Sequence, residues 1–310
     1  MMIPKIIHQT APYDKAKTRT FKINRSRTMR KILTDNGWKE AQDNEVIDFS
    51  YWDNYKTNIP ESSISVYPRK IINILDNKKS MFKMFESHNL TSFLPKTYID
   101  LQNLDSNIFD KDKLFFLKDV GASGNKGVYV IKSKNEMENI IKTNPNPLQY
   151  ILQEEVENMY LHDGKKCMIR AYGLIVNNIN YLYNDAKFNI YKKEYSKTNI
   201  DNSIHNDEHP RSVNYIPLSS IYFHKAVLEK IRGICKHFDL FFKDKYIANR
   251  FIILGIDFIL NINKDPILIE VNIYPDLTSI PVEFDEQFTK DVLDIVINDK
   301  QNVANFNICN

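Results

Sequence analysis

Glycine is scarce in this chain, and three of the few glycines lie close together. Only 8 of the 310 residues are glycine, against an average frequency of about 7 %. Gly121, Gly124 and Gly127 nevertheless share one short stretch between two apolar runs. Most turns must therefore rely on other residues, and asparagine is the natural substitute because it tolerates positive φ. The cluster marks a place where a side chain would hinder the backbone.

Composition excludes several classes of protein. The chain is 43% hydrophobic and 26% charged, which excludes collagen-like, low-complexity and wholly disordered chains. It has no apolar run of about 18 residues or more and no signal-peptide pattern, so we expect a cytoplasmic protein without a membrane span. Cys167, Cys235 and Cys309 lie far apart, which argues against a disulfide framework or a thiolate zinc site.

The positive charge of the chain is concentrated near its beginning. The net charge of +3 is too small to indicate a nucleic-acid protein. Residues 15–31, however, carry eight cations and no acid. This basic segment is either a solvated face or a docking patch for an acidic polymer. Nucleic acid is the weaker choice of polymer, because Phe21 is the one aromatic residue among the cations.

Apolar periodicity and turn residues predict a mixed order of strands and helices over about two domains, or three small ones. Strands are expected at 3–7, 114–118, 128–132, 150–153, 168–176, 179–183, 251–260 and 266–271. Helices are expected at 78–88, 134–142 and 222–238. Asn177 and Asn178 form a predicted hairpin turn, and residues 192–211 a predicted long loop.

The glycine cluster lies in a loop from Lys118 to Val128. Successive backbone N–H groups there can cradle phosphate oxygens, and Lys118 supplies a point charge. The loop lacks the Walker A pattern, and no helix follows it as a dinucleotide site requires. On this segment alone, a purely structural hairpin is as good an interpretation.

The last predicted hairpin carries polar residues within apolar strands. Glu270 and Asn272 are two residues apart and share one face of a strand. If the turn is centred between Asn263 and Lys264, Asp257 lies opposite Glu270 with the two Cβ atoms about 5 Å apart. Such a pair is costly to bury without a cation, and an all-oxygen set suits Mg²⁺ that bridges phosphates. The alternative is a pair of carboxylates that face solvent at a sheet edge.

Taken in order, these features resemble an ATP-grasp enzyme, and more narrowly the tubulin–tyrosine ligase and ligase-like family. Residues 165–175 follow the family's Arg-Lys-Phe-Asp-Ile-Arg-x-Tyr-x-Leu-Val pattern, and residues 270–275 keep its Glu-Val-Asn-x-x-Pro pattern intact. The segments 36–38 (Asn-Gly-Trp) and 78–80 (Lys-Lys-Ser) also resemble the family. Order and spacing carry the resemblance more than any single motif.

The resemblance implies an α+β fold of the ATP-grasp type. A small amino-terminal α/β domain would precede central and carboxy-terminal domains that sandwich ATP. The expected boundaries are 1–77 for substrate docking, 78–153 for the central domain with its phosphate lid, and 154–310 for the carboxy-terminal domain with the Mg²⁺ site. ATP and Mg²⁺ are the implied cofactors.

The resemblance also implies roles for individual residues. Nucleotide contacts fall to Lys79, Lys118, Gly121, Gly124, Gly127, Gln153, Glu154, Val156 and Lys166. Mg²⁺ binding falls to Asp257, Glu270 and Asn272, and catalytic contacts to Arg170, Lys187 and Asn199. An acceptor carboxylate would take the γ-phosphate of ATP, and an amine would then displace phosphate to give an amide.

Three positions depart from the family pattern. Met168 stands where the family has an aspartate, so one polar contact is missing. Lys187 stands where an arginine is expected, which keeps the charge but loses bidentate recognition. Asn199, after Thr198, only partly matches the family's Leu-Thr-Asn segment. These departures bear on amino-acid specificity first and on activity second.

The implied partners are a free amino acid and an acidic protein or peptide tail, with tubulin as one candidate, which the basic segment would dock. We expect a monomer that modifies a protein after translation. Three alternatives stay open: an ATP-grasp ligase for a small molecule or another peptide, a ligase-like binding module without catalysis, and a sugar-nucleotide glycosyltransferase. The last rests on residues 2–10, which resemble the opening strand of such enzymes, but its Asp-x-Asp motif has only a poor candidate at 110–112.

Overall fold

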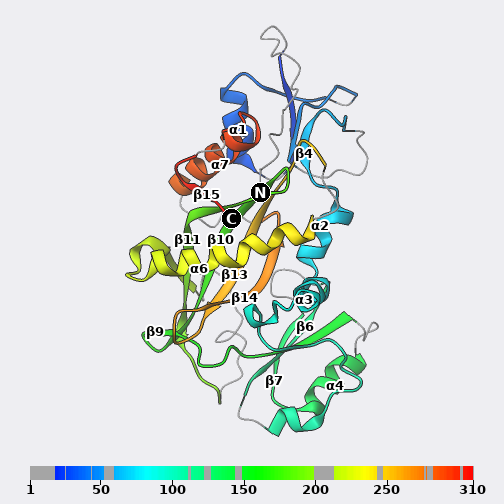
Figure 1. Ribbon diagram of the computed structural model, residues 1–310, viewed down its shortest axis with the longest axis vertical. Coiled ribbons are helices and arrows are strands. Elements are labelled where there is room, and N and C mark those ends of the chain that lie inside the picture. The colour runs from blue at the N-terminus through cyan, green and yellow to red at the C-terminus, as the bar shows by residue number, and fades with distance from the viewer. Residues whose placement is uncertain are drawn as a thin grey trace.

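The protein has an elongated mixed α+β fold with two β-sheets (Figure 1). This confirms the fold class predicted from the sequence. The computed structural model describes residues 18–24, 26–42, 44–51, 59–110, 113–121, 127–143, 149–198, 213–242, 247–275, 277, 282–300 and 303–309. The predicted strand at 3–7 and the resemblance carried by residues 2–10 lie outside these residues.

The larger sheet joins strands from both ends of the chain. Its main order is β12-β11-β10-β13-β4-β3-β1-β2, with β14 paired to β13, β15 to β11 and β9 to β10. The strands are β1 (Thr20–Ile23), β2 (Lys39–Glu40), β3 (Phe49–Tyr51), β4 (Ile64–Val66), β9 (Leu161–His162), β10 (Lys165–Val176), β11 (Ile179–Glu194), β12 (Val213–Pro217), β13 (Arg250–Leu260), β14 (Pro266–Ile273) and β15 (Phe306–Ile308). Strands before and after the predicted central domain therefore share one sheet, while the domain boundaries themselves stay a prediction.

The smaller sheet has the order β5-β8-β6-β7. Its strands are β5 (Thr97–Tyr98), β6 (Phe115–Asp119), β7 (Val128–Ile131) and β8 (Tyr150–Glu154). Phe115 and Leu117 of β6 pack with Met137 of helix α4 (Lys134–Thr143) in one apolar cluster. Because side chains alternate along a strand, Phe116 and Lys118 point from the opposite face.

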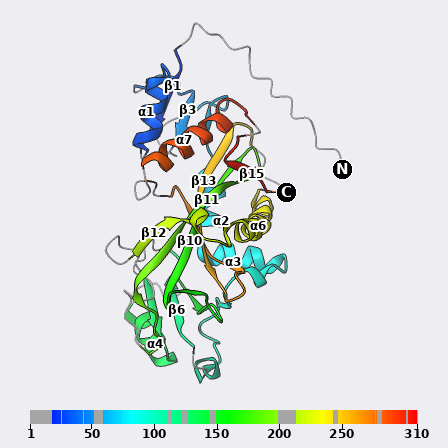
Figure 2. The ribbon, with the colours of Figure 1, turned by 90° about the vertical axis from the view of Figure 1, so that its left-hand side faces the viewer.

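Five further helices pack on the larger sheet or beside it (Figures 1 and 2). They are α1 (Arg27–Asp35), α2 (Arg69–Asp76), α3 (Lys78–Ser87), α6 (His224–Cys235) and α7 (Val282–Val296), and the 3-10 turns are η1 (Thr91–Phe93), η2 (Ser106–Asp110), η4 (Leu218–Ser220) and η5 (Lys236–Phe241). Helix α3 begins after Asn77, whose side chain accepts the N–H of Ser80 at 2.9 Å. This cap fixes the first helical residue as Lys78. Within the described residues, no helix is long and apolar enough to cross a membrane, and the cytoplasmic location stays a prediction.

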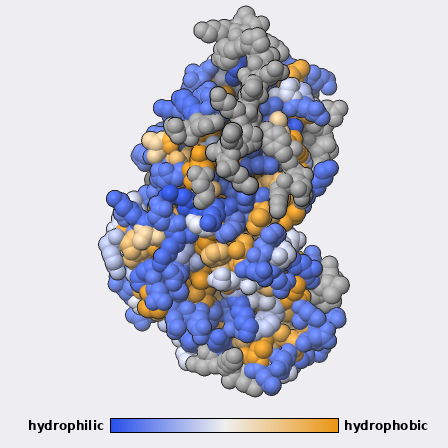
Figure 3. All heavy atoms as spheres, in the orientation of Figure 1, coloured by the Kyte–Doolittle hydropathy of each residue, from blue (hydrophilic) through white to orange (hydrophobic). Residues whose placement is uncertain are grey.

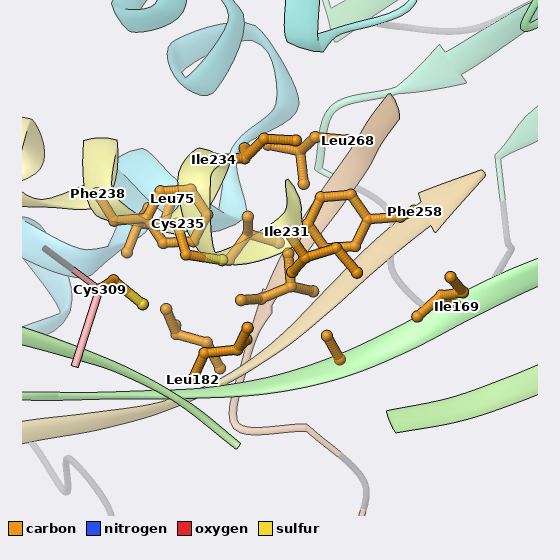
Figure 4. Packing of buried hydrophobic residues seen from close by; sticks show 14 of the residues in the cluster. Leu75, Ile169, Leu182, Ile231, Ile234, Cys235, Phe238, Phe258, Leu268 and Cys309 are labelled. Carbon is orange, nitrogen blue, oxygen red and sulfur yellow. The ribbon is translucent and has the colours of Figure 1, made fainter. Parts of the chain in front are cut away.

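The two faces of the larger sheet have different neighbours. Helices α2, α3 and α6 cover one face, where Ile169, Phe258 and Leu268 lie in a buried cluster (Figure 4). On the other face, Phe49 and Phe251 pack with Phe288 of α7. Strand β13 contributes even-numbered residues to the first cluster and odd-numbered ones to the second. Further along the same odd-numbered face lies the cleft described below.

Turn chemistry follows the prediction from glycine scarcity. Among the described residues, six of the ten non-glycine positions with positive φ are asparagines. Asn177 and Asn178, at φ 47° and 66°, form the predicted turn between β10 and β11. Asparagine thus takes the left-handed positions that glycine usually fills.

Most predicted elements are confirmed within one to four residues, with some exceptions. Strand β11 continues to Glu194, so the predicted loop at 192–211 begins with strand residues, because Lys165 of β10 pairs with Glu194. Residues 199–211 of that loop lie outside the described part of the chain. Helices α1, α2 and α7 were not predicted from the sequence.

Candidate active site

A cleft lies between the two sheets. The smaller sheet contributes Phe116, Lys118, Val128, Gln153 and Glu154 to its lining. The larger sheet contributes Lys166, Met168, Tyr191, Asp257, Ile259, Ile269 and Glu270, and Pro95, Glu155 and Val156 complete it. Most of the predicted nucleotide and metal residues thus meet here, although they are spread over more than 150 positions of the sequence.

Asp257 and Glu270 occupy paired positions of β13 and β14, which confirms the predicted pairing. The turn differs from the prediction, because Leu260 pairs with Pro266, which centres the turn on Asn263. A regular ladder from there would place Ile269 opposite Asp257. A β-bulge shifts the register between Phe258 and Asp257, so that Ile269 and Glu270, neighbours in sequence, both line the cleft.

Both carboxylates have partners from the chain. Arg170 donates through Nη2 to Oδ2 of Asp257 at 2.8 Å and through Nε to Oδ1. Asn272 Nδ2 donates to Asp257 Oδ2 at 3.0 Å and to Glu270 Oε1 at 3.2 Å. Lys78 Nζ lies 3.3 Å from Glu270 Oε2. Because Asp257 is fully buried, these contacts replace the water that its charge would otherwise need.

The ionisation of Glu270 depends on these neighbours. Burial opposes its charge, but the positive charges of Lys78, Lys118 and Arg170 and the hydrogen bond from Asn272 outweigh burial and lower its pKa to about 2. Glu270 is therefore an anion at neutral pH. An anionic carboxylate surrounded by lysine and arginine is a pattern that clusters at functional sites.

Gly255 gives Arg170 its room. A Cβ atom at position 255 would lie 2.8 Å from Cβ of Pro275 and 3.2 Å from Cδ of Arg170. The first distance is shorter than side-chain packing allows. Glycine at this position therefore leaves room for Pro275 and for the side chain of Arg170.

The opposite end of the cleft is apolar and has one unsatisfied acceptor. Gln153 Nε2 donates to Thr97 Oγ1 at 3.0 Å, while Gln153 Oε1 is buried and has no hydrogen-bond partner among the residues that the structure describes. Val156, Met168 and Ile259 form a buried cluster that also lines the cleft. A buried acceptor without a partner calls for a donor from a ligand, and the cluster offers a flat apolar group a surface to pack on.

Glu154 is engaged by other side chains. It accepts from Lys113 at 2.9 Å and from Tyr98 at 2.7 Å, and Lys96 lies 3.3 Å away. Burial opposes its charge, yet these three groups lower the pKa of Glu154. The side chain is thus committed to its own ion pairs, and a contact from this position to a nucleotide would come from the main chain.

Two lysines line the cleft, and a third lies beside one of its carboxylates. Lys118 and Lys166 are both buried, and Lys166 Nζ lies 5.3 Å from the ring centres of Phe116 and Tyr191. The third is Lys78, which the sequence analysis did not assign. Lys79, which it did assign, lines a separate hollow with residues of α4. The sequence feature that distinguishes Lys78 from Lys79 is Asn77, which caps the helix and so fixes the direction of each side chain that follows.

The hairpin of β13 and β14 lies in the part of the chain that a comparison with known families recognises. Residues 225–308 match the model of the tubulin-tyrosine ligase family. This part of the chain is therefore similar to the tubulin-tyrosine ligase family. The match confirms the resemblance seen in the sequence. A search of curated proteins found no significant match to the chain.

The tubulin-tyrosine ligase family consists in general of ATP-dependent, ATP-grasp-type ligases that use Mg²⁺. A mixed α+β structure with a cleft between two sheets is compatible with an ATP-grasp-like fold. Met168, which stands where the family has an aspartate, belongs to the apolar cluster that lines the cleft together with Gln153. At this position the cleft therefore has an apolar side chain in place of a polar contact.

The remaining predicted residues lie around the cleft or outside the described part. Lys187 of β11 pairs with Arg170 of β10, so both side chains leave the same face of the sheet, and its Nζ lies 4.7 Å from the ring centre of Tyr215. The N–H of Gly121 donates to Asp119 at 2.8 Å, and Gly127 has a φ of 73°. Gly124 and Asn199 lie outside the described residues.

The donor set of the predicted metal site is two carboxylates and one amide. In the described part of the chain, no group of three histidine, cysteine, aspartate or glutamate side chains could hold a metal. Asp257 and Glu270 offer oxygen ligands, and Asn272, whose Nδ2 faces both carboxylates here, would offer its amide oxygen after rotation of the amide. Such a set fits Mg²⁺ when phosphate oxygens and waters complete its coordination. The set is thus suited to a metal that arrives with a nucleotide.

Proposed function

We propose that this protein is an ATP-dependent ligase that joins the amine of an amino acid to a carboxylate of a protein or peptide. The observation that carries the proposal is the cleft itself. It is lined by paired carboxylates, two lysines and an apolar pocket with an acceptor that has no partner among the described residues. Lys78 and Arg170 pair with the two carboxylates. This combination suits the phosphates and the base of one nucleotide.

The base of ATP would lie on the cluster of Val156, Met168 and Ile259. There, the exocyclic amine of adenine could donate to Gln153 Oε1, which has no hydrogen-bond partner in the described part of the chain. The triphosphate would then extend toward Lys118, Lys166 and Lys78, whose charges offset its own. Asp257, Glu270 and Asn272 would hold Mg²⁺, which neutralises the β- and γ-phosphates.

The reaction would proceed in two steps. An oxygen of the acceptor carboxylate attacks the γ-phosphorus, the bond from that phosphorus to the bridging oxygen breaks, and ADP leaves. The amine of the amino acid then attacks the carbonyl carbon of the acyl phosphate, loses a proton and expels phosphate, which leaves an amide. Arg170 and Lys187, which are paired across β10 and β11, would stabilise negative charge on the acyl phosphate.

The acceptor would be an acidic tail that the basic segment docks. In the described part of this segment, Arg27 and Arg30 belong to α1 and are exposed. Lys31 pairs with Asp35 at 2.6 Å, and Arg30 lies 3.5 Å from Glu40. Exposed pairs of this kind contribute little stability, so the cations remain available to an acidic peptide.

Nucleotide turnover tests the proposal. We expect ADP from Mg·ATP when both a carboxylate acceptor and an amino acid are present, and loss of turnover in Glu270→Gln. Lys230→Gln is the matched control, because Lys230 pairs with Asp265 at the exposed end of the same hairpin. Mg·ATP that protects the protein thermally without any turnover would instead identify a binding module. If Mg·ATP gives no thermal protection and no turnover is seen, the nucleotide site is refuted.

A further inference from the structure

The carboxylates of the cleft are neutralised by the chain itself. Asp257 is paired with Arg170, Glu270 with Lys78, and Asn272 donates to both acids. Arg170 and Lys78, with Lys118 nearby, therefore offset the two negative charges before any metal ion is added. A divalent cation that approached this set would have to displace at least one of these partners.

The two cations have little access to water as an alternative partner. The side chain of Arg170 is 16% exposed and that of Lys78 is 12% exposed. Arg170 also lies against Gly255, which limits the paths that it can take. Removing a buried charge from its partner costs several kcal/mol unless a new partner is supplied. A metal ion without a nucleotide supplies none.

A triphosphate does supply such partners. Arginine binds phosphate with the same two-pronged geometry that it uses for a carboxylate, and lysine binds phosphate as a point charge. We propose that Arg170 and Lys78 are internal counter-ions that close the carboxylate pair to divalent cations until the phosphates of a nucleotide draw them away. This inference rests on the proposed function, since it takes the cleft as the nucleotide site.

The consequence is a coupled order of binding. A metal ion and a nucleotide each bind poorly to these residues alone, since each leaves charges of the other sign uncompensated. Together they replace two ion pairs within the chain by ion pairs between chain and ligand. Such coupling between two ligands is reciprocal and typically reaches about 5- to 150-fold in affinity.

Mn²⁺ is a suitable probe, because it replaces Mg²⁺ at oxygen sites and its binding can be followed by electron paramagnetic resonance. We expect wild-type protein to bind Mn²⁺ weakly alone and tightly with a non-hydrolysable ATP analogue. Arg170→Gln removes one counter-ion and should bind Mn²⁺ alone about tenfold more tightly than wild type does. Lys78→Gln should act in the same direction and serves if Arg170→Gln does not fold.

A matched control removes a lysine from another carboxylate of the same hairpin. Lys230→Gln frees Asp265 and should leave Mn²⁺ binding unchanged. Wild-type protein that binds Mn²⁺ alone as tightly as Arg170→Gln does would overturn the inference. The inference would also be overturned if Arg170→Gln and Lys78→Gln gained no affinity for Mn²⁺ alone while wild type still bound Mn²⁺ together with the analogue. If wild type takes up no Mn²⁺ even with the analogue, the proposed function itself fails.

Discussion

At the residue scale, the sequence interpretation and the structure differ over which of two adjacent lysines lies beside the carboxylates of the cleft. Lys78 lies 3.3 Å from Glu270, whereas Lys79 lines a hollow beside α4. Sequence spacing could not choose between them, because consecutive helical residues point about 100° apart and the choice depends on where the helix begins. The side chain of Asn77 fixes that beginning.

Lys78→Gln should therefore lower kcat by about 10²-fold, the typical effect of removing one charge-stabilising donor from an active site. Lys79→Gln, a substitution of the same kind one position later, should change kcat little. Steady-state ADP release from Mg·ATP measures both. A larger loss of kcat in Lys79→Gln than in Lys78→Gln would instead support Lys79 as the lysine that contacts the nucleotide. It would also show that the contact of Lys78 with Glu270 has no role in the reaction.

The lowered pKa of Glu270 predicts a dependence of stability on pH. The pKa is about 2 in the folded chain against 4.5 as its ordinary value. Its ionised form therefore stabilises the fold above about pH 4.5, and this stabilisation is lost as pH falls toward 2. The difference in unfolding free energy between wild type and Glu270→Gln should be on the order of 2–3 kcal/mol at neutral pH and should shrink over this window. Urea unfolding at a series of pH values tests this, and a constant difference would contradict it.

At the element scale, the hairpin of β13 and β14 shows how one strand serves both the core and the cleft. Leu268 is fully buried in the cluster under α6, and the next residue, Ile269, lines the cleft. The bulge then places Glu270 on the cleft side as well. One register shift thus puts an apolar and an acidic residue next to each other in the site.

Neighbouring substitutions should separate these two functions. Leu268→Ala leaves a cavity in the core and should lower stability by about 2–5 kcal/mol. Ile269→Ala should leave stability close to wild type but raise KM for ATP by about tenfold, since it removes apolar contact from the cleft. Urea unfolding and ATP kinetics on both variants test this. Equal effects of the two substitutions on KM would contradict the assignment of the two faces.

Elements defined by local pattern were predictable, and those defined by distant partners were not. The alternation of apolar residues and the asparagine turns specify β10, β11, β13 and β14 locally. The end of β11 is polar, and it is a strand only because β10 pairs with it as far as Glu194. The bulge at Ile269 could likewise not be predicted from the sequence, because a hairpin pattern is compatible with either of two pairing registers.

At the scale of the whole molecule, the site depends on chain segments that the sequence keeps far apart. Arg170 from β10 meets Asp257 from β13 because these strands are neighbours in the larger sheet, and Lys78 from α3 reaches Glu270 of β14. The order of motifs in the sequence assigned Arg170, Asp257 and Glu270 to one site, and their chemical roles stay a prediction. It did not show that β13 pairs with β4 and so links the carboxy-terminal hairpin to the strands of the first 77 residues.

Charge on the molecular surface should govern docking of the acceptor. In the orientation of Figure 3, hydrophilic residues cover much of the visible face, with apolar patches between them. Arg27→Glu combined with Lys31→Glu should raise KM for an acidic polymeric acceptor several-fold and leave the KM for ATP unchanged. The effect should weaken as salt is added, because surface charges are screened. Lys225→Glu, an exposed reversal on α6, is the control, and an equal effect there would contradict a specific dock.

The central claim is that the cleft forms an amide bond with ATP as the energy source. The most direct measurement is the intact mass of acidic peptides after incubation with the protein, Mg·ATP and a mixture of amino acids. We predict a peptide that gains the mass of one amino-acid residue, with ADP formed in equal amount, and no such product with Glu270→Gln. Unchanged peptide masses across the full set of amino acids, under conditions in which Mg·ATP is bound, would contradict the ligase account.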